Sequence, residues 1–475
     1  MKVLLVNPPI PLSFSNKEFY LPSGLLYIAA VLKQGGHTVS LLDMKTFRVE
    51  EREFPQKYCE TALMKAIRSF SPGVVAFGCL FSGNFHDVIH FSKLCKEECP
   101  TIPVVIGGIH PTIYPFEILM NCPSIDWVVL GEGEQSFLSL MEAFCSRRKD
   151  VSDIDGIAYR SGGRVVINPK KNYIDDLDVL PFPAYDIVSL QDYHVDTSLW
   201  HNPRRLPINT SVPIISSRSC PHSCPFCSMY MAMGPKWRTR SAANVVDEIE
   251  YVYRTFGHQH YSFMDDNFSL SKRRTIDICE EIIRRNLLIQ FETPNGLSVN
   301  TLDKDVLDAM VAAGLTRISL AIESGSDYIR NRIMKKNLSR EKIFDVVSMA
   351  KSFSQLFVKA FFVIGAPEET EETLQDTFTM IQEINVDKIH LMNMVPFPST
   401  KIYEQAVKDN LLIDLNPEDL YCSDALYVVN YGTFFIKPYS MTLDALRTFR
   451  TRCEQMIAEQ ELKRRLECQR ERAVV

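Results

Sequence analysis

The stretch Cys220-Pro221-His222-Ser223-Cys224-Pro225-Phe226-Cys227 decides the fold of this chain. It follows a predicted strand over residues 213–216 and carries three cysteines, separated by three and then by two residues. This spacing lets a tight loop turn three thiolates toward one point, which suits a cubane iron–sulfur cluster. The loop has no fourth cysteine, so one iron keeps an open coordination position, much as catalytic zinc sites do.

Other uses of these cysteines are less favoured. A structural zinc site needs a fourth ligand, and His222 lies between the cysteines, where its ring is expected to point away from their common focus. Disulfides are disfavoured in a reducing compartment. The other ten of the thirteen cysteines, for example Cys79, Cys145 and Cys279, sit in apolar runs and are expected to be buried as small hydrophobic side chains.

A series of alternating strands and helices surrounds the cysteine loop. Helical spacing separates successive strands, for example over residues 245–255 and 303–313. Six βα units predict a partial (β/α)6 barrel with its functional groups at the carboxyl ends of the strands. The six predicted strands cover residues 213–216, 261–264, 291–293, 317–322, 358–364 and 388–392.

The first 150 residues show the same alternation and predict a doubly wound, Rossmann-like parallel sheet, which makes the chain an α/β protein. Ligands of such sheets bind beyond the carboxyl ends of the strands. The predicted strands cover residues 2–6, 37–42, 73–77, 103–106 and 126–130, and the predicted helices cover residues 25–34, 59–70, 85–99 and 136–146.

The loops after four of these strands are rich in glycine and small polar residues. Such residues let the backbone approach a flat or phosphorylated ligand closely. The loops read Asn7-Pro8-Pro9, Gly78-Cys79-Leu80-Phe81-Ser82-Gly83, Gly107-Gly108-Ile109-His110-Pro111-Thr112 and Gly131-Glu132-Gly133-Glu134.

The rest of the chain links and closes these two parts. We expect a domain over residues 1–150, a connector over 151–208, the barrel over 209–400 and a mostly helical closing region over 401–475. The last region contains a predicted helix over 442–472, with Leu446, Phe449 and Cys453 on one face, followed by Met456 or Ile457.

Composition excludes several classes of protein. The 475 residues are 46% hydrophobic and 23% charged with a net charge of −6, which argues against disorder and gives no general reason to bind nucleic acid. No apolar run approaches the roughly 18 residues that span a bilayer. The opening apolar run is too short for a signal peptide, so a reduced, cytoplasmic protein is expected.

Cys220, Cys224 and Cys227 resemble the CxxxCxxC signature of the radical S-adenosylmethionine (SAM) superfamily. The resemblance implies a 4Fe-4S cluster and SAM as cofactors. SAM is a zwitterionic sulfonium ligand, so its site needs an acidic partner, polar groups and an apolar slot. One departure is the second-strand element Asp265-Asp266-Asn267, where many relatives have Gly-Gly-Glu. The residues that the resemblance places at SAM are Phe226 near the adenine, Asp265 and Asp266 at the amino group, Glu323 and Ser324 near the carboxylate and ribose, and Gly365, Pro367 and Pro396 at later strand ends.

The first half resembles the cobalamin-binding domain of cobalamin-dependent radical SAM enzymes, including class B methyltransferases. It lacks the Asp-x-His-x-x-Gly signature, so no protein histidine is expected to ligate cobalt, and His90 is expected on a helix surface. His110 is expected either to contact the cofactor or to cap the following turn. The expected cobalamin contacts are Asn7, Pro8, Gly24, Ser82, Gly108, His110, Thr112, Gly131, Glu132 and Glu134; the connector motif Pro181-x-Pro183-x-Tyr185-Asp186 supports the resemblance.

The resemblance implies a radical SAM enzyme that uses cobalamin to methylate an unactivated carbon of a small-molecule or lipid-like substrate. A reductant such as flavodoxin or ferredoxin would be its partner. The alternative is oxidative cyclisation, ring rearrangement or carbon–carbon coupling without methyl transfer; a non-catalytic metal-binding module is a third reading. Phe268 and Phe397 would exclude water or simply pack in the core. Arg204-Arg205 and Lys236-Trp237-Arg238 are surface charges or contacts to an acidic substrate.

Overall fold

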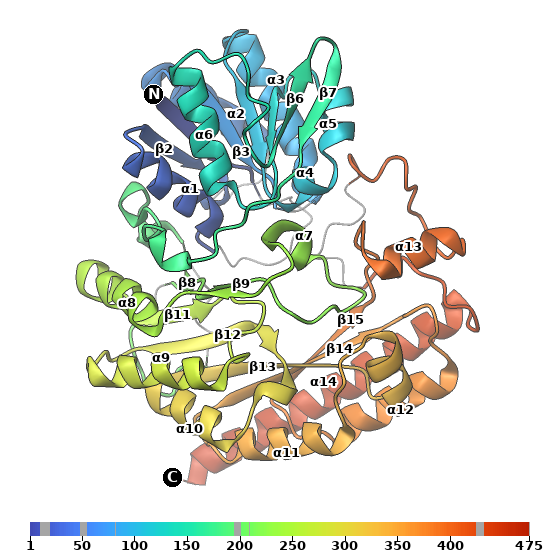
Figure 1. Ribbon diagram of the computed structural model, residues 1–475. Coiled ribbons are helices and arrows are strands. Elements are labelled where there is room, and N and C mark those ends of the chain that lie inside the picture. The colour runs from blue at the N-terminus through green and yellow to red at the C-terminus, as the bar shows by residue number, and fades with distance from the viewer. Residues whose placement is uncertain are drawn as a thin grey trace. The chain divides into compact units, whose positions relative to one another are not determined.

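A computed structural model describes residues 1–9, 20–47, 55–80, 82–193, 201–208, 210–423 and 432–474, with the backbone alone at 55 and 465–474. Phe81, part of the predicted connector (194–200) and part of the predicted closing region (424–431 and 475) lie outside these residues. The chain forms two compact units, each with its own sheet (Figure 1). Unit 1 comprises Met1–Thr197, Met229–Arg238 and Asn416–Val429, and unit 2 comprises Ser198–Ser228, Thr239–Leu415 and Asn430–Val475.

Unit 1 is built on a seven-stranded sheet of order β2-β1-β3-β4-β5-β6-β7. The first five strands are parallel, which confirms the predicted doubly wound sheet, and β6 and β7 add an antiparallel hairpin. The order reverses at β1, so the ligand crevice of such a sheet is expected between the ends of β1 and β3. The strands are β1 (Lys2–Asn7), β2 (Thr38–Asp43), β3 (Val74–Gly78), β4 (Val104–Gly107), β5 (Trp127–Val129), β6 (Ile157–Ser161) and β7 (Arg164–Asn168).

Helices cover this sheet. Val3 and Leu5 lie in the core that α1 and α6 bury on one face, whereas α2 and α3 pair with each other. Leu4 and Val6 are fully buried too, as expected for a parallel strand covered on both faces. The helices are α1 (Ser23–Gln34), α2 (Pro55–Phe70), α3 (Phe85–Glu98), α4 (Ile109–Ile113), α5 (Pro115–Asn121), α6 (Gly133–Cys145) and α7 (Met229–Met233), and a short 3-10 turn, η2 (Ser82–Asn84), precedes α3.

Unit 2 is built on six parallel strands in the order β15-β14-β13-β12-β11-β8. Each strand pairs with the next in the chain, which confirms the predicted βα series of a partial barrel. Among the described strands, β8 and β15 end the sheet, so the barrel is not closed. The strands are β8 (Val212–Ile214), β11 (His260–Phe263), β12 (Gln290–Leu297), β13 (Leu315–Glu323), β14 (Phe357–Ile364) and β15 (Lys388–Asn393), and β9 (Ser217–Arg218) pairs separately with β10 (Arg238–Thr239).

The helices of unit 2 begin at side-chain caps that the sequence supplies. Ser241, Ser271 and Asp303 each accept a hydrogen bond from a backbone N–H in the first turn, and Thr370 forms a capping box with Thr373. These caps fix where each helix starts after its loop. The helices are α8 (Ala242–Phe256), α9 (Lys272–Arg284), α10 (Lys304–Ala313), α11 (Arg340–Lys351), α12 (Glu371–Glu383), α13 (Lys401–Lys408) and α14 (Leu443–Val474).

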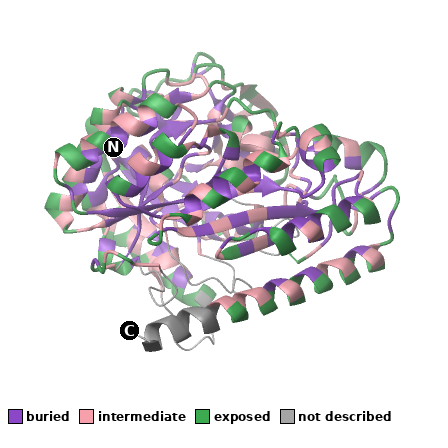
Figure 2. Cartoon of the chain, turned by 90° about the horizontal axis from the view of Figure 1, so that it is seen from below, coloured by how far each residue is buried: buried purple, intermediate pink, exposed green. Residues whose placement is uncertain are grey.

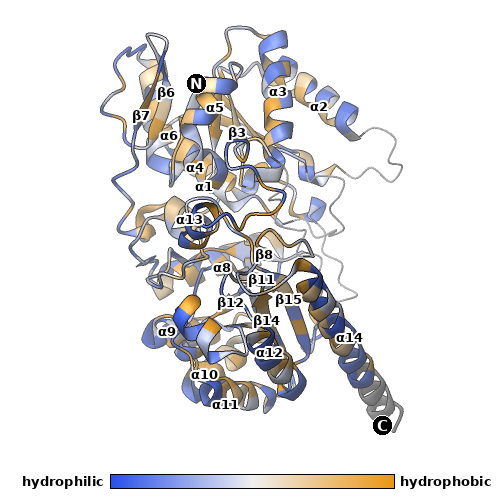
Figure 3. Ribbon diagram, turned by 90° about the vertical axis from the view of Figure 1, so that its right-hand side faces the viewer, coloured by the Kyte–Doolittle hydropathy of each residue, from blue (hydrophilic) through white to orange (hydrophobic). Residues whose placement is uncertain are grey.

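The long last helix confirms the predicted helical tail. Leu446 and Cys453 are fully buried and Ile457 is nearly so, and Figure 2 shows buried residues recurring along one side of α14. The other residues over 443–464 of this helix are largely hydrophilic (Figure 3). This pattern is that of a helix packed along one face.

Two expectations about local structure were wrong. Strand β12 is longer than predicted because it continues through Pro294-Asn295-Gly296, a sequence typical of a turn, by means of register shifts against β13. Cys145 is exposed at the end of α6, although Cys79 and Cys279 are buried as expected.

Candidate functional site

The three cysteines of the loop after β9 lie in unit 2 as half-buried free thiols. The backbone N–H of Cys227 donates to the Cys224 carbonyl at 3.1 Å and closes the second turn of the loop. Burial raises the pKa of Cys220 and Cys224 above that of an ordinary thiol. His222 is exposed, consistent with a ring that points away from the cysteines.

Asp265, just beyond the end of β11, holds the chain that leads into this loop. Its carboxylate accepts hydrogen bonds from the Ser216 hydroxyl at 2.7 Å, the Ser216 N–H at 3.2 Å and the Ser217 hydroxyl. Arg274 adds a bond to the Ser216 carbonyl at 2.6 Å. Asp265 therefore helps to position the cysteine loop, and its expected contact with a ligand stays a prediction.

Asp266 is placed differently. It lies close enough to Cys220 to raise the pKa of that thiol, and its own pKa is raised to about 6 by burial and by the charge of Asp265. Of the two second-strand acids, Asp266 is the one that acts on Cys220, and its carboxylate accepts a hydrogen bond from the Ser219 backbone.

Lys336 is a site residue that the sequence did not reveal. Its ammonium lies 2.9 Å from Glu323 Oε1, and both side chains are largely buried. Burial alone would lower the pKa of Lys336, but the charges of Glu323, Cys224 and Cys220 raise it. In the sequence Lys335-Lys336 looks like any exposed basic pair, so only tertiary structure reveals the buried member.

Glu323 itself has unusual backbone geometry. It ends β13 with φ +70°, immediately after a register shift against β14. Such a conformation is costly for a residue other than glycine and is typical of functional sites. It directs a carboxylate at the Lys336 ammonium beside the cysteine loop.

An apolar surface adjoins the loop. Phe226 packs against a cluster that contains Val363, Ala366 and Met394 from the ends of β14 and β15. The fold therefore brings Phe226 together with the predicted Gly365–Pro367 segment. Pro367 and Pro396 are both buried. An apolar surface of this kind suits a flat apolar group.

Glu369 shapes this turn and was not singled out from the sequence. Its carboxylate accepts bonds from the N–H groups of Gly365 at 3.2 Å and Ala366 at 3.4 Å, and from the Thr373 hydroxyl at 2.9 Å. Burial raises its pKa to about 7. Its neighbours in Glu368-Glu369-Thr370 make it look like one of several surface acids, which is why sequence alone missed it.

Two predicted residues lie in the packed interior. The Ser324 hydroxyl is buried and bonds to Thr377 Oγ1 at 3.2 Å. Phe268 packs against Phe263 and Phe291, so core packing is its observed role. Phe397 is half-buried.

The three thiols suit a cluster better than a single ion. In the described part of the chain, no three His, Cys, Asp or Glu side chains gather as ligands of one metal ion. A cubane binds each thiolate on a different iron, so its cysteines need not converge on one atom. Cys220, Cys224 and Cys227 lie on one short loop, form no disulfide and fit that ligand set.

In unit 1, hydrogen bonds join the predicted ligand loops along the carboxyl edge of the sheet. Asn84 donates to the Pro9 carbonyl at 2.7 Å, which links the loops after β1 and β3. The Thr112 hydroxyl donates to the Gly108 carbonyl at 2.7 Å and accepts from the Gly131 N–H at 2.9 Å, which links the loops after β4 and β5. The four loops therefore form one edge.

Gly108 is required by close packing. Its φ is +122°, and an added Cβ would lie 2.3 Å from the Cys79 carbonyl oxygen. No other residue fits this approach of the β3 and β4 loops without a backbone shift. Gly24, in contrast, is exposed in the first turn of α1 with open space around it.

His110 is buried beneath these loops. Its Nδ1 lies 2.9 Å from the Ser82 hydroxyl, and its ring packs between Phe85 and Tyr114. Burial lowers its pKa to about 4, although the Tyr421 backbone opposes this shift. Only 1% of His110 is exposed, so its observed role is the bond to Ser82, and its expected contact with a cofactor stays a prediction.

Two other predicted contacts of unit 1, Asn7 and Glu132, have internal partners. Asn7 donates to Asp43 at 2.9 Å, and Asp43 also accepts from the Tyr193 hydroxyl at 2.8 Å. Glu132 forms a buried ion pair with Arg238. Glu134 is buried, and Pro8 is half-buried.

The predicted basic patches are mostly structural. Arg204 donates to the carbonyl groups of Ile289, Val311 and Ala312, which includes the end of α10. Lys236 is an exposed surface charge. Arg238 is neither a surface charge nor open to a substrate, because Glu132 pairs with it in the interior. His90 bonds to Glu60 on the helix surface, as expected.

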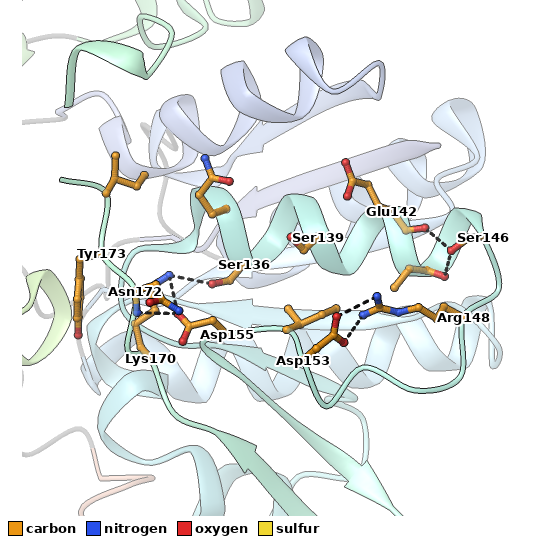
Figure 4. Close-up of a pocket in the computed structure, with 14 residues that line it drawn as sticks. Ser136, Ser139, Glu142, Ser146, Arg148, Asp153, Asp155, Lys170, Asn172 and Tyr173 are labelled. Atoms are coloured by element: carbon orange, nitrogen blue, oxygen red, sulfur yellow. Dashed lines mark hydrogen bonds and ion pairs between the residues drawn. The ribbon is translucent and has the colours of Figure 1, made fainter. Parts of the chain in front are cut away.

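A pocket beside α6 contains none of the predicted site residues (Figure 4). It lies among α6, the segment around Asp153 and residues 170–174, and two of its cations have partners in its lining. Lys170 bonds to Ser136 at 3.0 Å, and Arg148 pairs with Asp153 at 2.7 Å.

Two families match parts of the chain. Residues 15–141 match the B12 binding domain, and residues 214–381 match the radical SAM superfamily. The first match spans most of the parallel strands of unit 1, and the second begins at β8 and includes the cysteine loop. The two matched ranges contain most of the candidate binding loops described above.

Two relatives match most of the chain. An uncharacterized methyltransferase of Pyrococcus horikoshii is 31% identical over 418 residues, which cover 88% of this chain and 85% of that protein. The anaerobic magnesium-protoporphyrin IX monomethyl ester cyclase of Rubrivivax gelatinosus is 28% identical over 390 residues, which cover 81% of this chain and 66% of the cyclase.

A solved structure shares the fold. The radical SAM methyltransferase TsrM from Kitasatospora setae, with cobalamin and a 4Fe-4S cluster bound, superposes with a TM-score of 0.67 at 19% identity, covering 88% of this chain and 76% of TsrM. No helix in the described residues is both long and apolar enough to cross a bilayer.

Proposed function

This chain belongs to the radical SAM enzymes that carry a B12-binding domain, and from that premise we propose that it methylates an unactivated carbon of a small-molecule or lipid-like substrate. The observation that carries the proposal is the presence in one chain of the cysteine loop with its Lys336–Glu323 pair and of a glycine-rich edge on a B12-type sheet. The name of the Pyrococcus relative favours methyl transfer.

The cysteine loop would hold the cluster. Asp265 holds the entry of the loop, and the backbone bond from Cys227 to Cys224 closes its second turn. When bound, the cluster and SAM supply a radical that removes hydrogen from carbon, and cobalamin carries the methyl group.

The residues around the loop suit the three parts of SAM. Lys336 has the charge that a carboxylate requires, and Glu323 holds its ammonium in place. Asp266 is suited to the ammonium of SAM. Phe226 and the cluster around Ala366 would provide the apolar surface for the adenine, with Glu369 fixing the backbone of that turn.

The edge of unit 1 is proposed to bind cobalamin. Gly108 and Gly131 allow close backbone approach, and His110 orients the Ser82 hydroxyl while staying neutral and buried. We assign residues 1–150 to cobalamin binding, 209–400 to the radical chemistry and 401–475 to a closing region, with 151–208 as connector.

A radical reaction without methyl transfer is the second candidate, favoured by the likeness to the Rubrivivax cyclase. Either reaction requires an electron donor, for which a flavodoxin or ferredoxin is suited. Among the described residues the cysteines form no disulfide and stay as thiols. Such thiols and the cluster ligands both suit a reducing compartment such as the cytoplasm.

The test is an anaerobic incubation of the loaded protein with methyl-labelled SAM, a chemical reductant and a metabolite extract. Mass spectrometry then follows the label. Methyl transfer predicts a labelled carbon product, together with both S-adenosylhomocysteine and 5′-deoxyadenosine. An unlabelled product formed with 5′-deoxyadenosine alone would overturn methyl transfer and support the second candidate.

A further inference from the structure

The segment Met229–Arg238, which begins two residues after Cys227, belongs to unit 1 although the cysteines belong to unit 2. It starts with α7, which contacts α4 in the loop region after β4. Its backbone also reaches the β5 loop, since a Cβ on Gly131 would lie 3.1 Å from the Ala232 carbonyl oxygen. The segment therefore packs on two of the four loops proposed to bind cobalamin.

A buried ion pair fixes the far end of this segment. The Arg238 guanidinium meets both carboxylate oxygens of Glu132, at 2.7 and 2.9 Å, and the two side chains are 2% and 1% exposed. Arg238 also donates to the Ile174 carbonyl at 2.7 Å, and the Ile174 N–H donates to Glu132 at 3.1 Å. An ion pair with such supporting hydrogen bonds sets one geometry.

Aromatic packing adds to this anchor. The Tyr173 ring lies against Gly234, where an added Cβ would be 2.9 Å from the ring, and the Arg238 guanidinium lies 5.4 Å from the ring centroid. Gly234 has φ +77°, so the chain turns there in a conformation that glycine favours. The segment is thus seated by charge and by shape.

We propose that this segment couples the two cofactors: a cluster bound at Cys227 tightens cobalamin binding at the Gly131–Glu132 loop, through the Arg238–Glu132 pair. The inference rests on the proposed binding of cobalamin by unit 1. A cluster fixes the start of the segment, and the ion pair then restricts the motion of the Gly131–Glu132 loop. Cobalamin binding therefore costs less conformational entropy in that loop. By linkage, cobalamin must tighten retention of the cluster by the same factor.

The experiment measures the dissociation constant of hydroxocobalamin by anaerobic absorbance titration. The full-length protein is titrated with its cluster reconstituted and again after the cluster is removed by a chelator. The wild-type protein is expected to bind hydroxocobalamin about tenfold more tightly when loaded, within the usual range of coupling between sites. In Glu132→Gln the two constants are expected to agree within about twofold.

Two further variants keep the test decisive. Gly234→Ala disturbs the seat of the segment without touching the charges and is expected to reduce the coupling, so it carries the test if Glu132→Gln does not fold. Asp175→Asn removes an ion pair with Lys236 in the same segment, but both side chains there are more than 70% exposed. It is the matched control and should keep the wild-type coupling.

Each outcome decides the matter. Equal affinities of loaded and stripped wild-type protein overturn the coupling, as does a folded Glu132→Gln or Gly234→Ala protein that retains it. Loss of coupling in Asp175→Asn overturns the role of the buried pair. A wild-type protein that binds no hydroxocobalamin in either state overturns the proposed cobalamin site itself, and the inference with it.

Discussion

The two candidate binding regions are built from different materials. In unit 2 the site consists of reactive and charged side chains: three thiols, the Lys336–Glu323 pair and Asp266. In unit 1 the edge consists mainly of backbone and small groups, with Gly108 and Gly131 at positive φ and hydroxyl groups joining the loops.

This difference predicts how each region fails. A site made of side chains loses its chemistry when one side chain is removed, while its fold survives. An edge made of backbone loses its shape when a side chain is added, because there is no space for it. Substitutions of the two kinds should therefore separate activity from stability.

The largest effect is expected at the cysteine loop. Cys224→Ala should reduce reductive SAM cleavage by about a thousandfold or more, because the cluster loses one of three ligands. Iron content, the absorbance of the cluster and 5′-deoxyadenosine yield measure the loss. The thermal stability of the cluster-free protein should change little.

Cys279→Ala is the matched control, since it removes a thiol that is buried in α9. It should cost about 1 kcal/mol of stability and leave the cluster intact. Equal cleavage by the Cys224→Ala and Cys279→Ala proteins would contradict the assignment of the loop.

The next effect is on stability, which should depend on pH with opposite sign at His110 in unit 1 and at Glu369 in unit 2. Burial lowers the pKa of His110 from 6.5 to about 4, so its contribution to stability is lost as the pH falls through that window. Burial raises the pKa of Glu369 from 4.5 to about 7, so its contribution is lost as the pH rises from 4.5 to 7. Each effect is about 3 kcal/mol.

Denaturant unfolding between pH 4 and 8 checks both slopes as differences from wild type. His110→Gln should flatten the acid side and Glu369→Gln the neutral side. If either variant keeps the wild-type slope, the cause assigned to that residue is wrong.

Removal of Lys336 should weaken SAM binding. Lys336→Met keeps the length of the side chain but leaves the carboxylate of SAM without its cation, and we expect a dissociation constant about 10- to 100-fold higher. Lys335→Met, at the exposed neighbouring position, should bind SAM as wild type does. Equilibrium dialysis of cluster-loaded protein measures both, and equal affinities of the two variants would exclude Lys336 from the site.

The smallest effect compares two glycines of unit 1. Gly108→Ala should destabilise the protein by about 2 kcal/mol, because the new Cβ meets the Cys79 carbonyl. Gly24→Ala should stabilise it by about 0.5 kcal/mol, because alanine favours the open first turn of α1. Thermal unfolding distinguishes the signs, and a stable Gly108→Ala protein would show that the loops are less tightly packed than described.

The sequence was sufficient where one residue type carries the signal. The buried parallel strands were predicted almost to their ends, because β1 and β14 are apolar or alternate strongly. The cysteine loop was predicted from spacing alone. Strand β12 was predicted too short because Pro294-Asn295-Gly296 is typical of a turn, and only pairing with β13 carries it through.

The sequence was insufficient where a role depends on a distant partner. Asp265 is used by Ser216 and Ser217, Lys336 is buried by Glu323, and Arg238 is neutralised by Glu132. In each case the sequence around the charged residue is typical of an exposed position, and only the folded structure shows its partner. The same limit explains why Glu369 was overlooked.

The central claim is that this one chain binds both a cluster and cobalamin. The most direct measurement is the content of anaerobically reconstituted protein in iron, sulfide and cobalt, compared between wild type and Cys220→Ala/Cys224→Ala/Cys227→Ala. The account predicts one 4Fe-4S cluster and one cobalamin per wild-type chain, with the cluster lost from the triple variant. A wild-type protein that holds the cluster and cleaves SAM but retains no cobalt would contradict it.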